Sequence, residues 1–255
     1  MTQIIIETYF WYFIVFSMVG YVCEVIYCSI PAKRFINRGF LQGPYLPVYG
    51  FGGLAVHLLL LPIAHAPLLV FLLGMLITSV IEYSAGFLLE ILFHTRLWDY
   101  SGHRFHIRGR VCLKNSLLFG LLAMASLYLL HPMIERLLGN LSPLLRTLGA
   151  FGMLVLMAID TTASAFRLIT FTERLGQLRR LKVLVESPLQ RISQNHDTVK
   201  ERLEMEMARL REQLHRTGRR LFDAFPSMRS PELDRQFRLV KEMIEERRAK
   251  RKKRP

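Results

Sequence analysis

The stretch from residue 39 to residue 81 is 43 residues long and has no charged side chain. A helix needs roughly 20 mostly apolar residues to cross the hydrocarbon of a bilayer, because this core is about 30 Å thick and each residue rises about 1.5 Å. The stretch is too long for one such helix, and Pro62 and Pro67 interrupt it. It therefore predicts two membrane helices joined by a hairpin, and it excludes an ordinary soluble domain.

Further apolar runs extend this interpretation to the whole N-terminal part of the chain. The predicted spans are about 8–28, 46–63, 68–92, 115–134 and 147–171. The first run has Glu7 where a signal peptide has basic residues, and it lacks a small-x-small cleavage site, so we expect a retained helix. The predicted fold class is an all-α polytopic membrane protein with five transmembrane helices.

The positions of Lys and Arg predict the orientation of these helices. Basic residues collect in cytoplasmic loops of membrane proteins. The N-terminal flank and the second loop have none. Basic residues are numerous in the first loop, in the third loop and in the tail, which has 23, and they are few in the fourth loop. They are Lys33, Arg34 and Arg38 (first loop), Arg96, Arg104, Arg108, Arg110 and Lys114 (third loop), and Arg136 and Arg146 (fourth loop). This alternation predicts a multi-pass membrane protein with its N-terminus outside and its C-terminus cytoplasmic.

The charge is divided unevenly between two predicted domains. Residues 1–172 have a net charge of +4, and residues 173–255 have +10. We expect a transmembrane bundle at 1–172 and a basic cytoplasmic helical tail at 173–255. The helix of the fifth span is expected to continue to about residue 186, before Ser187-Pro188, and Phe225-Pro226 is expected to end the next one.

Apolar side chains recur at helical spacing in the tail. They predict either a short coiled coil or a face that packs on a partner, on the membrane or on the bundle. They are Leu203, Met207, Leu210, Leu214 and Leu221. A last helix is expected from Ser230-Pro231. The basic residues of 247–254 favour anionic lipid as a binding partner over nucleic acid, for which no recognition motif is present.

Charged side chains inside the predicted spans need an explanation, because each costs at least about 2.5–3.5 kcal/mol in hydrocarbon. Together with small polar neighbours they form one polar stripe on each of three helices. The stripes are Ser17, Gly20 and Glu24; Glu82, Gly86 and Glu90; and Asp160, Ser164 and Arg167. The simplest packing turns the stripes toward one another and away from lipid.

The depth of each charge suggests its role. Glu24, Glu90 and Arg167 are expected near the cytoplasmic ends, where Arg167 would pair with one of the two glutamates. Glu82 is about 12 Å deeper than Glu90, and Asp160 lies near the midplane. We expect Glu82 and Asp160 to form a water-accessible site, with structural pairing of the acids as the alternative.

Two predicted cytoplasmic loops contain dense motifs. The first is glycine- and proline-rich, which predicts a fixed irregular backbone packed in protein or lining a cavity. The third combines aromatic and basic residues, which suit the headgroup layer. The candidate motif residues are Asn37, Arg38, Gly39, Gly43 and Pro44, and then Arg96, Trp98, Asp99, Tyr100, Gly109 and Arg110.

Three strings in and beside these loops resemble the bacterial membrane-protein family named putative ABC-transporter permease (type IV, CmpB-like). They are residues 37–50, 82–101 and 109–120, within a resemblance that covers most of residues 17–132. His106 stands where the family pattern leads us to expect Asn. The resemblance implies a polytopic membrane protein with a role in transport, and it supplies no catalytic or substrate-binding residues.

Missing motifs narrow the function further. The sequence contains no G-x-x-x-x-G-K-[ST], so a permease of this kind would need a separate ATPase subunit. Five spans are few for a complete transporter, which implies a homo- or hetero-oligomer. No catalytic residue, cofactor or metal site is predicted.

Three functions remain open from the sequence. We predict a transport component or permease subunit whose polar stripes form the pathway. The alternative is a membrane scaffold or regulator that presents its cytoplasmic helices to a partner. A third possibility is an enzyme acting on lipid-linked substrate with Asp99, the loop arginines and an intramembrane glutamate.

Overall fold

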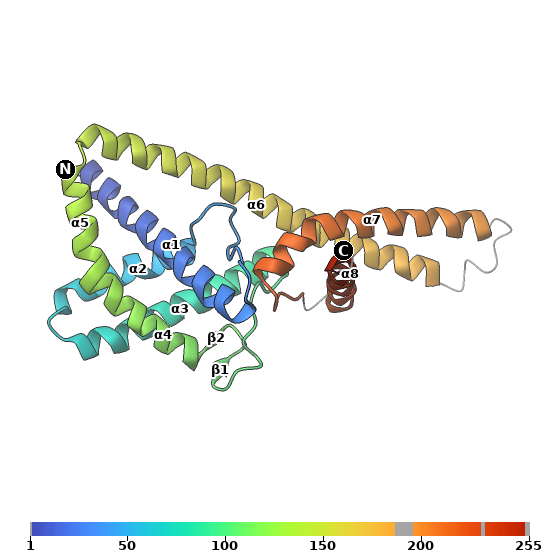
Figure 1. Cartoon of the computed structure of the whole chain (residues 1–255), viewed down its shortest axis with the longest axis horizontal. Coiled ribbons are helices and arrows are strands. Elements are labelled where there is room, and N and C mark those ends of the chain that lie inside the picture. Colours follow the sequence, from blue (N-terminus) through green and yellow to red (C-terminus); the bar gives the residue numbers. More distant parts are fainter. Residues whose placement is uncertain (1, 187–195, 231–232, 253–255) are drawn as a thin grey trace. The chain divides into compact units, whose positions relative to one another are not determined.

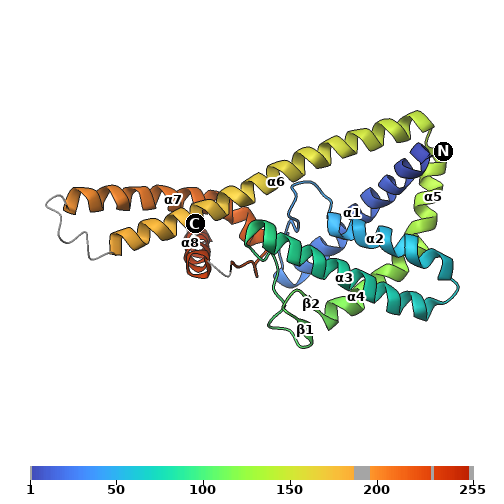
Figure 2. The same cartoon turned by 180° about the vertical axis from the view of Figure 1, so that it is seen from behind.

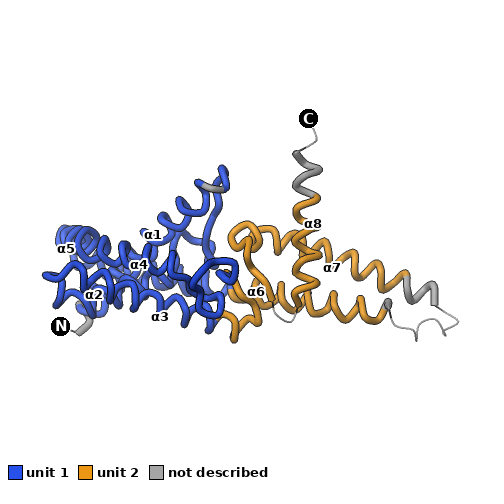
Figure 3. Tube along the Cα trace, turned by 90° about the horizontal axis from the view of Figure 1, so that it is seen from below, with its two compact units in different colours: residues 1–88, 99–164 blue, residues 89–98, 165–255 orange. Residues whose placement is uncertain are grey.

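The computed structural model describes residues 2–186, 196–230 and 233–252. The chain is almost entirely helical in this part (Figure 1). Its internal contacts divide it into two compact units, which are coloured separately in Figure 3. Unit 1 comprises residues 1–88 and 99–164, and unit 2 comprises residues 89–98 and 165–255.

The helices run in chain order from α1 to α8. The first part contains α1 (Thr2–Ala32), α2 (Pro47–Leu60), a short 3-10 turn η1 (Leu61–Ile63) and α3 (Pro67–Phe93). A two-residue antiparallel hairpin follows, β1 (His106–Ile107) with β2 (Val111–Cys112). The remaining elements are α4 (Leu113–Ala125), a π-helical turn η2 (Ser126–Leu130), α5 (His131–Asn140), α6 (Pro143–Glu186), α7 (His196–Ala224) and α8 (Asp234–Lys252).

Four helical segments are long and apolar enough to cross a membrane. They are Ile5–Ile30, Pro67–Phe93, Leu113–Asn140 and Pro143–Leu184. Many of their large apolar side chains are exposed, including Leu68, Leu144 and Phe166, each close to 70% exposed. A surface of this kind suits lipid and not water. The prediction of an all-helical polytopic membrane fold is thus confirmed, whereas five spans and their orientation stay predictions.

The second predicted span, 46–63, is the exception, because Pro47–Ile63 is shorter than a membrane-spanning helix. The amide of Leu46 donates to the carbonyl oxygen of Ser17, halfway along α1, at 3.0 Å. From there α2 lies beside α1 and runs back toward its N-terminal end, where His57 stacks on Tyr12 with ring centroids 4.4 Å apart (Figures 1 and 2). Residues 33–46 therefore lead from the C-terminal end of α1 to its middle. Because α2 starts there, it runs along only the N-terminal half of α1.

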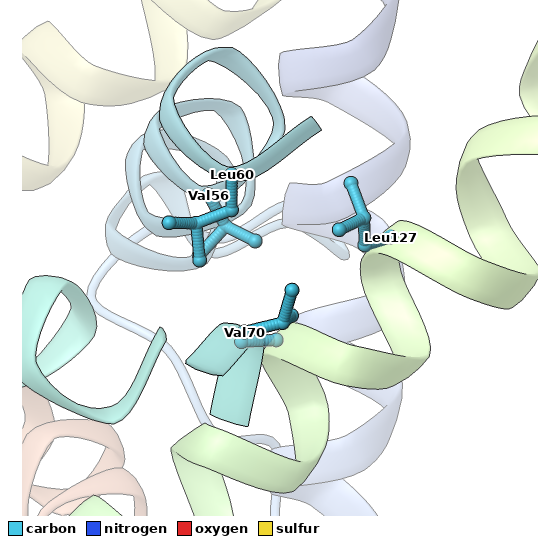
Figure 4. Packing of buried hydrophobic residues seen from close by; sticks show 5 residues of the cluster. Val56, Leu60, Val70 and Leu127 are labelled. Atoms are coloured by element: carbon cyan, nitrogen blue, oxygen red, sulfur yellow. The ribbon is translucent and has the colours of Figure 1, made fainter. Parts of the chain in front are cut away.

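Glycines allow α1 and α2 to approach closely. A methyl group on Gly50 would overlap the Ser17 hydroxyl and the Phe13 ring, and one on Gly53 would overlap the Phe16 ring. On another face, α2 packs against α3 and the α4–η2 segment through an apolar cluster. Figure 4 shows four of its side chains, Val56, Leu60, Val70 and Leu127, converging between these helices.

The fourth long segment contains one irregular turn. Residues 126–130 form the π-helix between α4 and α5, directly before His131-Pro132. Proline has no amide hydrogen, so Pro132 cannot donate to the carbonyl of Tyr128, and a widened turn is a usual response. Single π-turns inside helices are often found at functional sites.

Unit 2 has its own core. The rings of Phe171, Phe222 and Phe237 pack edge to face at 5.7–6.0 Å. Arg96 and Arg229 exchange two backbone hydrogen bonds of 2.8 and 3.0 Å, and Ser230 Oγ donates to the carbonyl oxygen of His94 at 2.8 Å. These bonds tie residues 89–98 into the unit formed by α7, α8 and the C-terminal part of α6.

The predicted tail helices are present with small changes. The helix of the fifth predicted span continues to Glu186, and α7 ends at Ala224, before Phe225-Pro226. The last helix begins at Asp234 and not at Ser230. In the predicted apolar seam Met207 and Leu214 are buried within unit 2, so part of the seam is used there, and no coiled coil is shown. Ser187-Pro188 and the side chains of 247–254 lie outside the described part of the chain.

Candidate functional site

The polar side chains predicted inside the bundle lie in separate places. Asp160 accepts hydrogen bonds from the glycine-rich loop and from Ser164, whereas Gly20 and Glu82 line one cavity. Glu24 binds side chains of the loop and of α2. The stripes on α1 and α3 therefore meet at this cavity, whereas the stripe on α6 binds the glycine-rich loop through Asp160.

Asp160 holds the glycine-rich loop through its backbone. Its Oδ2 accepts hydrogen bonds from the amides of Gln42 (2.9 Å) and Gly43 (2.8 Å) and from the hydroxyl of Tyr45 (2.9 Å). Its Oδ1 accepts from the Gln42 amide at 3.0 Å and from Ser164 Oγ at 3.1 Å. The carboxylate is well supplied with donors, as an anion partly shielded from water must be. This arrangement corresponds to the structural alternative raised for Asp160.

Part of the loop is packed in protein, whereas the side chains of Gln42 and Pro44 are exposed. Leu41 is 2% exposed and Tyr45 is 6% exposed. Gly39 has a φ of 155°, and a Cβ on Gly43 would overlap the Tyr45 ring. Asn37 Oδ1 accepts a hydrogen bond from Tyr21 at 2.9 Å. Irregular backbone is tolerated at membrane depth when its polar groups are satisfied in this way.

The glutamates near the helix ends have arginine partners other than the one expected. Glu24 accepts a hydrogen bond from Tyr49 at 2.8 Å and lies 3.5 Å from Arg38 Nε. Glu90 lies 2.9 Å from Arg96 Nε, within unit 2. Arg167, the expected partner, is exposed. Arginines of the loops, and not Arg167, thus neutralise these glutamates. Residue spacing along the helices could not predict this pairing, because the arginines lie outside them.

Glu82 is the most deeply buried acid of the predicted stripes, with 6% of its surface exposed. Its Oε1 accepts a hydrogen bond from Tyr100 at 3.1 Å, while Oε2 has no hydrogen-bond partner among the described residues. Glu82 lines a cavity of about 70 Å³. The cavity is bounded by α1, α2, α3 and the α4–η2 segment, and its other polar lining residues are Cys23, Tyr49, Thr78 and Ser126.

The loop before α4 positions Tyr100. Its amide donates to the carbonyl oxygen of Gly109 at 2.8 Å, and Gly109 has a φ of +71°, a conformation suited to glycine. Asp99 caps the turn by accepting from the amide and hydroxyl of Ser101 at 3.1 and 2.8 Å. Burial, with the nearby Glu82 and Glu24, raises the pKa of Tyr100 far above its usual range, so the phenol stays a hydrogen-bond donor.

Arg110 is a further positioning residue of this loop. Its guanidinium lies 5.2 Å from the ring centre of Tyr83 and 5.1 Å from that of Phe87, and it donates to the Tyr83 hydroxyl at 3.2 Å. Stacking of this kind holds the loop on α3. Trp98 is half-buried in unit 2, and the backbone of Arg96 belongs to the contact with Arg229 described above.

Sequence reasoning did not propose Tyr45 and Tyr49 as site residues, and it named Tyr100 as a motif residue without predicting that it binds an acid. Tyr45, Tyr49 and Tyr100 each donate to one carboxylate, Asp160, Glu24 and Glu82 respectively. The signal that was available is their place in or beside the two loop motifs. In the described part of the chain, no group of three or more His, Cys, Asp and Glu side chains is arranged to hold a metal ion.

These features define a class: a helical, multi-pass membrane protein with one buried acid, Glu82, beside an internal cavity. Comparison with known families makes the assignment specific. Residues 11–165 match the model of the family described as "Putative ABC-transporter type IV", and because this is more than half of the chain, the protein belongs to that family. Comparisons with curated proteins and with solved structures gave no match.

Proposed function

We propose that the chain is the permease subunit of a transporter and that the cavity beside Glu82 is part of its pathway. The observation that carries this proposal is the Glu82 side chain, which is buried in the apolar bundle and lines a cavity, with one carboxyl oxygen that has no hydrogen-bond partner among the described residues. Buried polar atoms are almost always paired with protein or water, and an acid inside a membrane bundle usually marks a route for ions or solutes.

The loop and α2 together support a five-crossing topology. Residues 33–46 and α2 each account for about half of the length of α1. In this proposal they make the second crossing together, with the N-terminus outside and the C-terminus cytoplasmic. Many transporters bind their substrates at such discontinuous segments near the membrane midplane, because irregular backbone there offers polar groups.

Energy would come from a separate ATPase subunit of a homo- or hetero-oligomer, because the sequence has no phosphate-binding loop. The bilayer with its anionic lipids would be the second partner, through the basic residues that follow α6. A location in the bacterial plasma membrane fits both the ATPase partner and the anionic lipids.

Cysteine accessibility tests the pathway. In a variant without Cys23, Cys28 and Cys112, a single cysteine at Thr78, which lines the cavity, is compared with one at Leu76, which is 58% exposed on the apolar surface of the same helix. A membrane-impermeant thiol reagent is then added from each side in turn. Thiolates form in water, so we expect labelling at 78 from one side and none at 76. Protection at 78 in a folded protein would overturn the proposal.

The second candidate, a membrane scaffold or regulator, is favoured by unit 2. Its aromatic core shows that the helices after α6 form a folded body and not a simple extension. A photoreactive residue at exposed Arg209 of α7 would cross-link a partner in native membranes. Cross-links to an ATPase would support the transporter, and cross-links to other proteins alone would support the scaffold.

A further inference from the structure

A cluster of aromatic and titratable side chains lies near the N-terminal end of α1, outside every motif found in the sequence. The imidazole of His57 (α2) stacks on Tyr12 (α1), and its centroid is 4.6 Å from that of His131 (α5). The Tyr12 hydroxyl and His131 Nδ1 are 2.7 Å apart. On the other side of the ring, His131 Nε2 lies 3.7 Å from a carboxylate oxygen of Glu135, whose side chain is 63% exposed.

This cluster has an exposed end and a buried end. Glu135 is its exposed end. His57 is 6% exposed, and its Nδ1 has no hydrogen-bond partner among the described residues. Tyr9 is the other titratable group facing His57, with ring centroids 6.1 Å apart. An unpaired imidazole nitrogen inside an apolar bundle requires a water or another proton-exchanging group.

The buried end lies one residue along the chain from the lining of the cavity beside Glu82. Val56 and Leu130, the chain neighbours of His57 and His131, line that cavity together with Glu82. The hydroxyl-bearing residues Thr78 and Ser126 line it as well. A cavity of about 70 Å³ has room for several water molecules, since one needs roughly 10–15 Å³ of such space.

We propose that Tyr12, His57 and His131 form a proton relay between the exposed Glu135 and the cavity of Glu82. The proposal deepens the transport function and rests on the cavity being part of a pathway; it names the proton as an ion that moves there. Imidazole suits this role because it accepts a proton on one nitrogen while it releases another from the second nitrogen.

The transfer conserves protons at every group. Glu135 gives a proton to Nε2 of His131, and the ring releases the proton on Nδ1 to the Tyr12 oxygen. Tyr12 passes its own hydroxyl proton, through water, to Nδ1 of His57. One proton has then moved from the exposed carboxyl to the buried end. Tyr12 has regained its proton from His131, His131 has regained one from Glu135 and ends as the Nε2 tautomer, and the exposed Glu135 carboxylate takes up a new proton from the surrounding water.

The test measures proton flux through the purified full-length protein in vesicles with an entrapped pH-sensitive dye. A potassium gradient with valinomycin supplies the driving potential. We expect flux above that of protein-free vesicles. The Tyr12→Phe variant retains the ring that packs but loses the hydroxyl, so we expect its flux to fall to the level of protein-free vesicles. His131→Gln should have the same effect.

His65→Gln is the matched control, because His65 is an exposed histidine in the turn before α3 and should leave the flux unchanged. Circular dichroism and size-exclusion profiles confirm that each variant is folded. A wild-type protein without flux, or a folded Tyr12→Phe variant with wild-type flux, would overturn the relay. The cysteine at position 78 separates the two proposals, since labelling there without any flux would leave the transporter standing and remove only the relay.

Discussion

Replacing Asp160 by Asn should loosen the glycine-rich loop strongly, although the two side chains have the same shape. The amide nitrogen of Asn is a donor, so one of the two positions around the side chain can no longer accept from the loop. In the structure, Oδ2 accepts from the Gln42 and Gly43 amides and from the Tyr45 hydroxyl. The Tyr45 hydroxyl can turn and accept instead, whereas a backbone amide cannot.

The size of the effect follows from these bonds. Hydrogen bonds to a charged group contribute about 1.5–3 kcal/mol each, so weakening two of them would cost about 3–6 kcal/mol. Asp160 is only partly buried, and water can replace some of this loss. We therefore expect the free energy of unfolding to fall by roughly 2–4 kcal/mol.

The matched comparison is Ser164→Ala, which removes only the 3.1 Å hydrogen bond from the serine hydroxyl to Asp160. This change should cost about 1 kcal/mol. Both variants are unfolded in mixed micelles with increasing denaturant, and a cysteine at Leu41, which is 2% exposed in the folded protein, reports the exposure of the loop. An Asp160→Asn variant no less stable than Ser164→Ala, with the loop still protected, would refute the reasoning.

Three further changes test other contacts. Gly50→Ala should lower the melting temperature, because the methyl group overlaps Ser17 and Phe13, while Gly52→Ala, whose nearest neighbour would be 3.8 Å away, should melt as the wild type does in the same thermal scan. Phe237→Ala should lower the free energy of unfolding of unit 2 by about 3–5 kcal/mol, because Phe237 is buried in its aromatic core. Leu239→Ala on the same helix should lower it by less than about 1 kcal/mol, because Leu239 is 40% exposed. Equal losses for the two variants in denaturant unfolding would contradict the aromatic core. Tyr100→Phe leaves Glu82 without its donor and should destabilise the bundle by about 1–3 kcal/mol; an unchanged melting curve would show that the hydrogen bond contributes nothing.

The long helices were predictable because hydrocarbon imposes a length and a composition that can be counted along the chain. The long apolar segments of the structure follow the predicted spans closely, and the continuation of α6 to Glu186 was expected as well. The predicted span 46–63 agrees with the bounds of the apolar helix Pro47–Ile63, but this helix is shorter than the four long segments, so its crossing of the membrane stays a prediction. Hydropathy sees one uncharged run and does not show that the loop before this helix is held to Asp160 by backbone amides.

The partners of the buried acids could be predicted only in part. Helical spacing placed Gly20 and Glu82 on inward faces, and both line the cavity. It could not assign Arg38 to Glu24 or Tyr100 to Glu82, since those donors reach the helices from loops whose path depends on the fold. The pairing of His57 with His131 was hidden for the same reason: 74 residues separate them in the chain, and each appeared as a lone histidine in an apolar helix.

The attachment of the loop to Asp160 has a consequence for which substitutions the protein can accept. Gln42 contributes its amide, while its side chain is exposed, so nearly any residue with a backbone N–H can stand at position 42. Position 43 must stay small beside the Tyr45 ring, and position 160 must carry a carboxylate. In a library of random variants, position 42 would therefore tolerate many different residues, while positions 43 and 160 would tolerate few. All three positions nevertheless take part in the same contact between loop and helix.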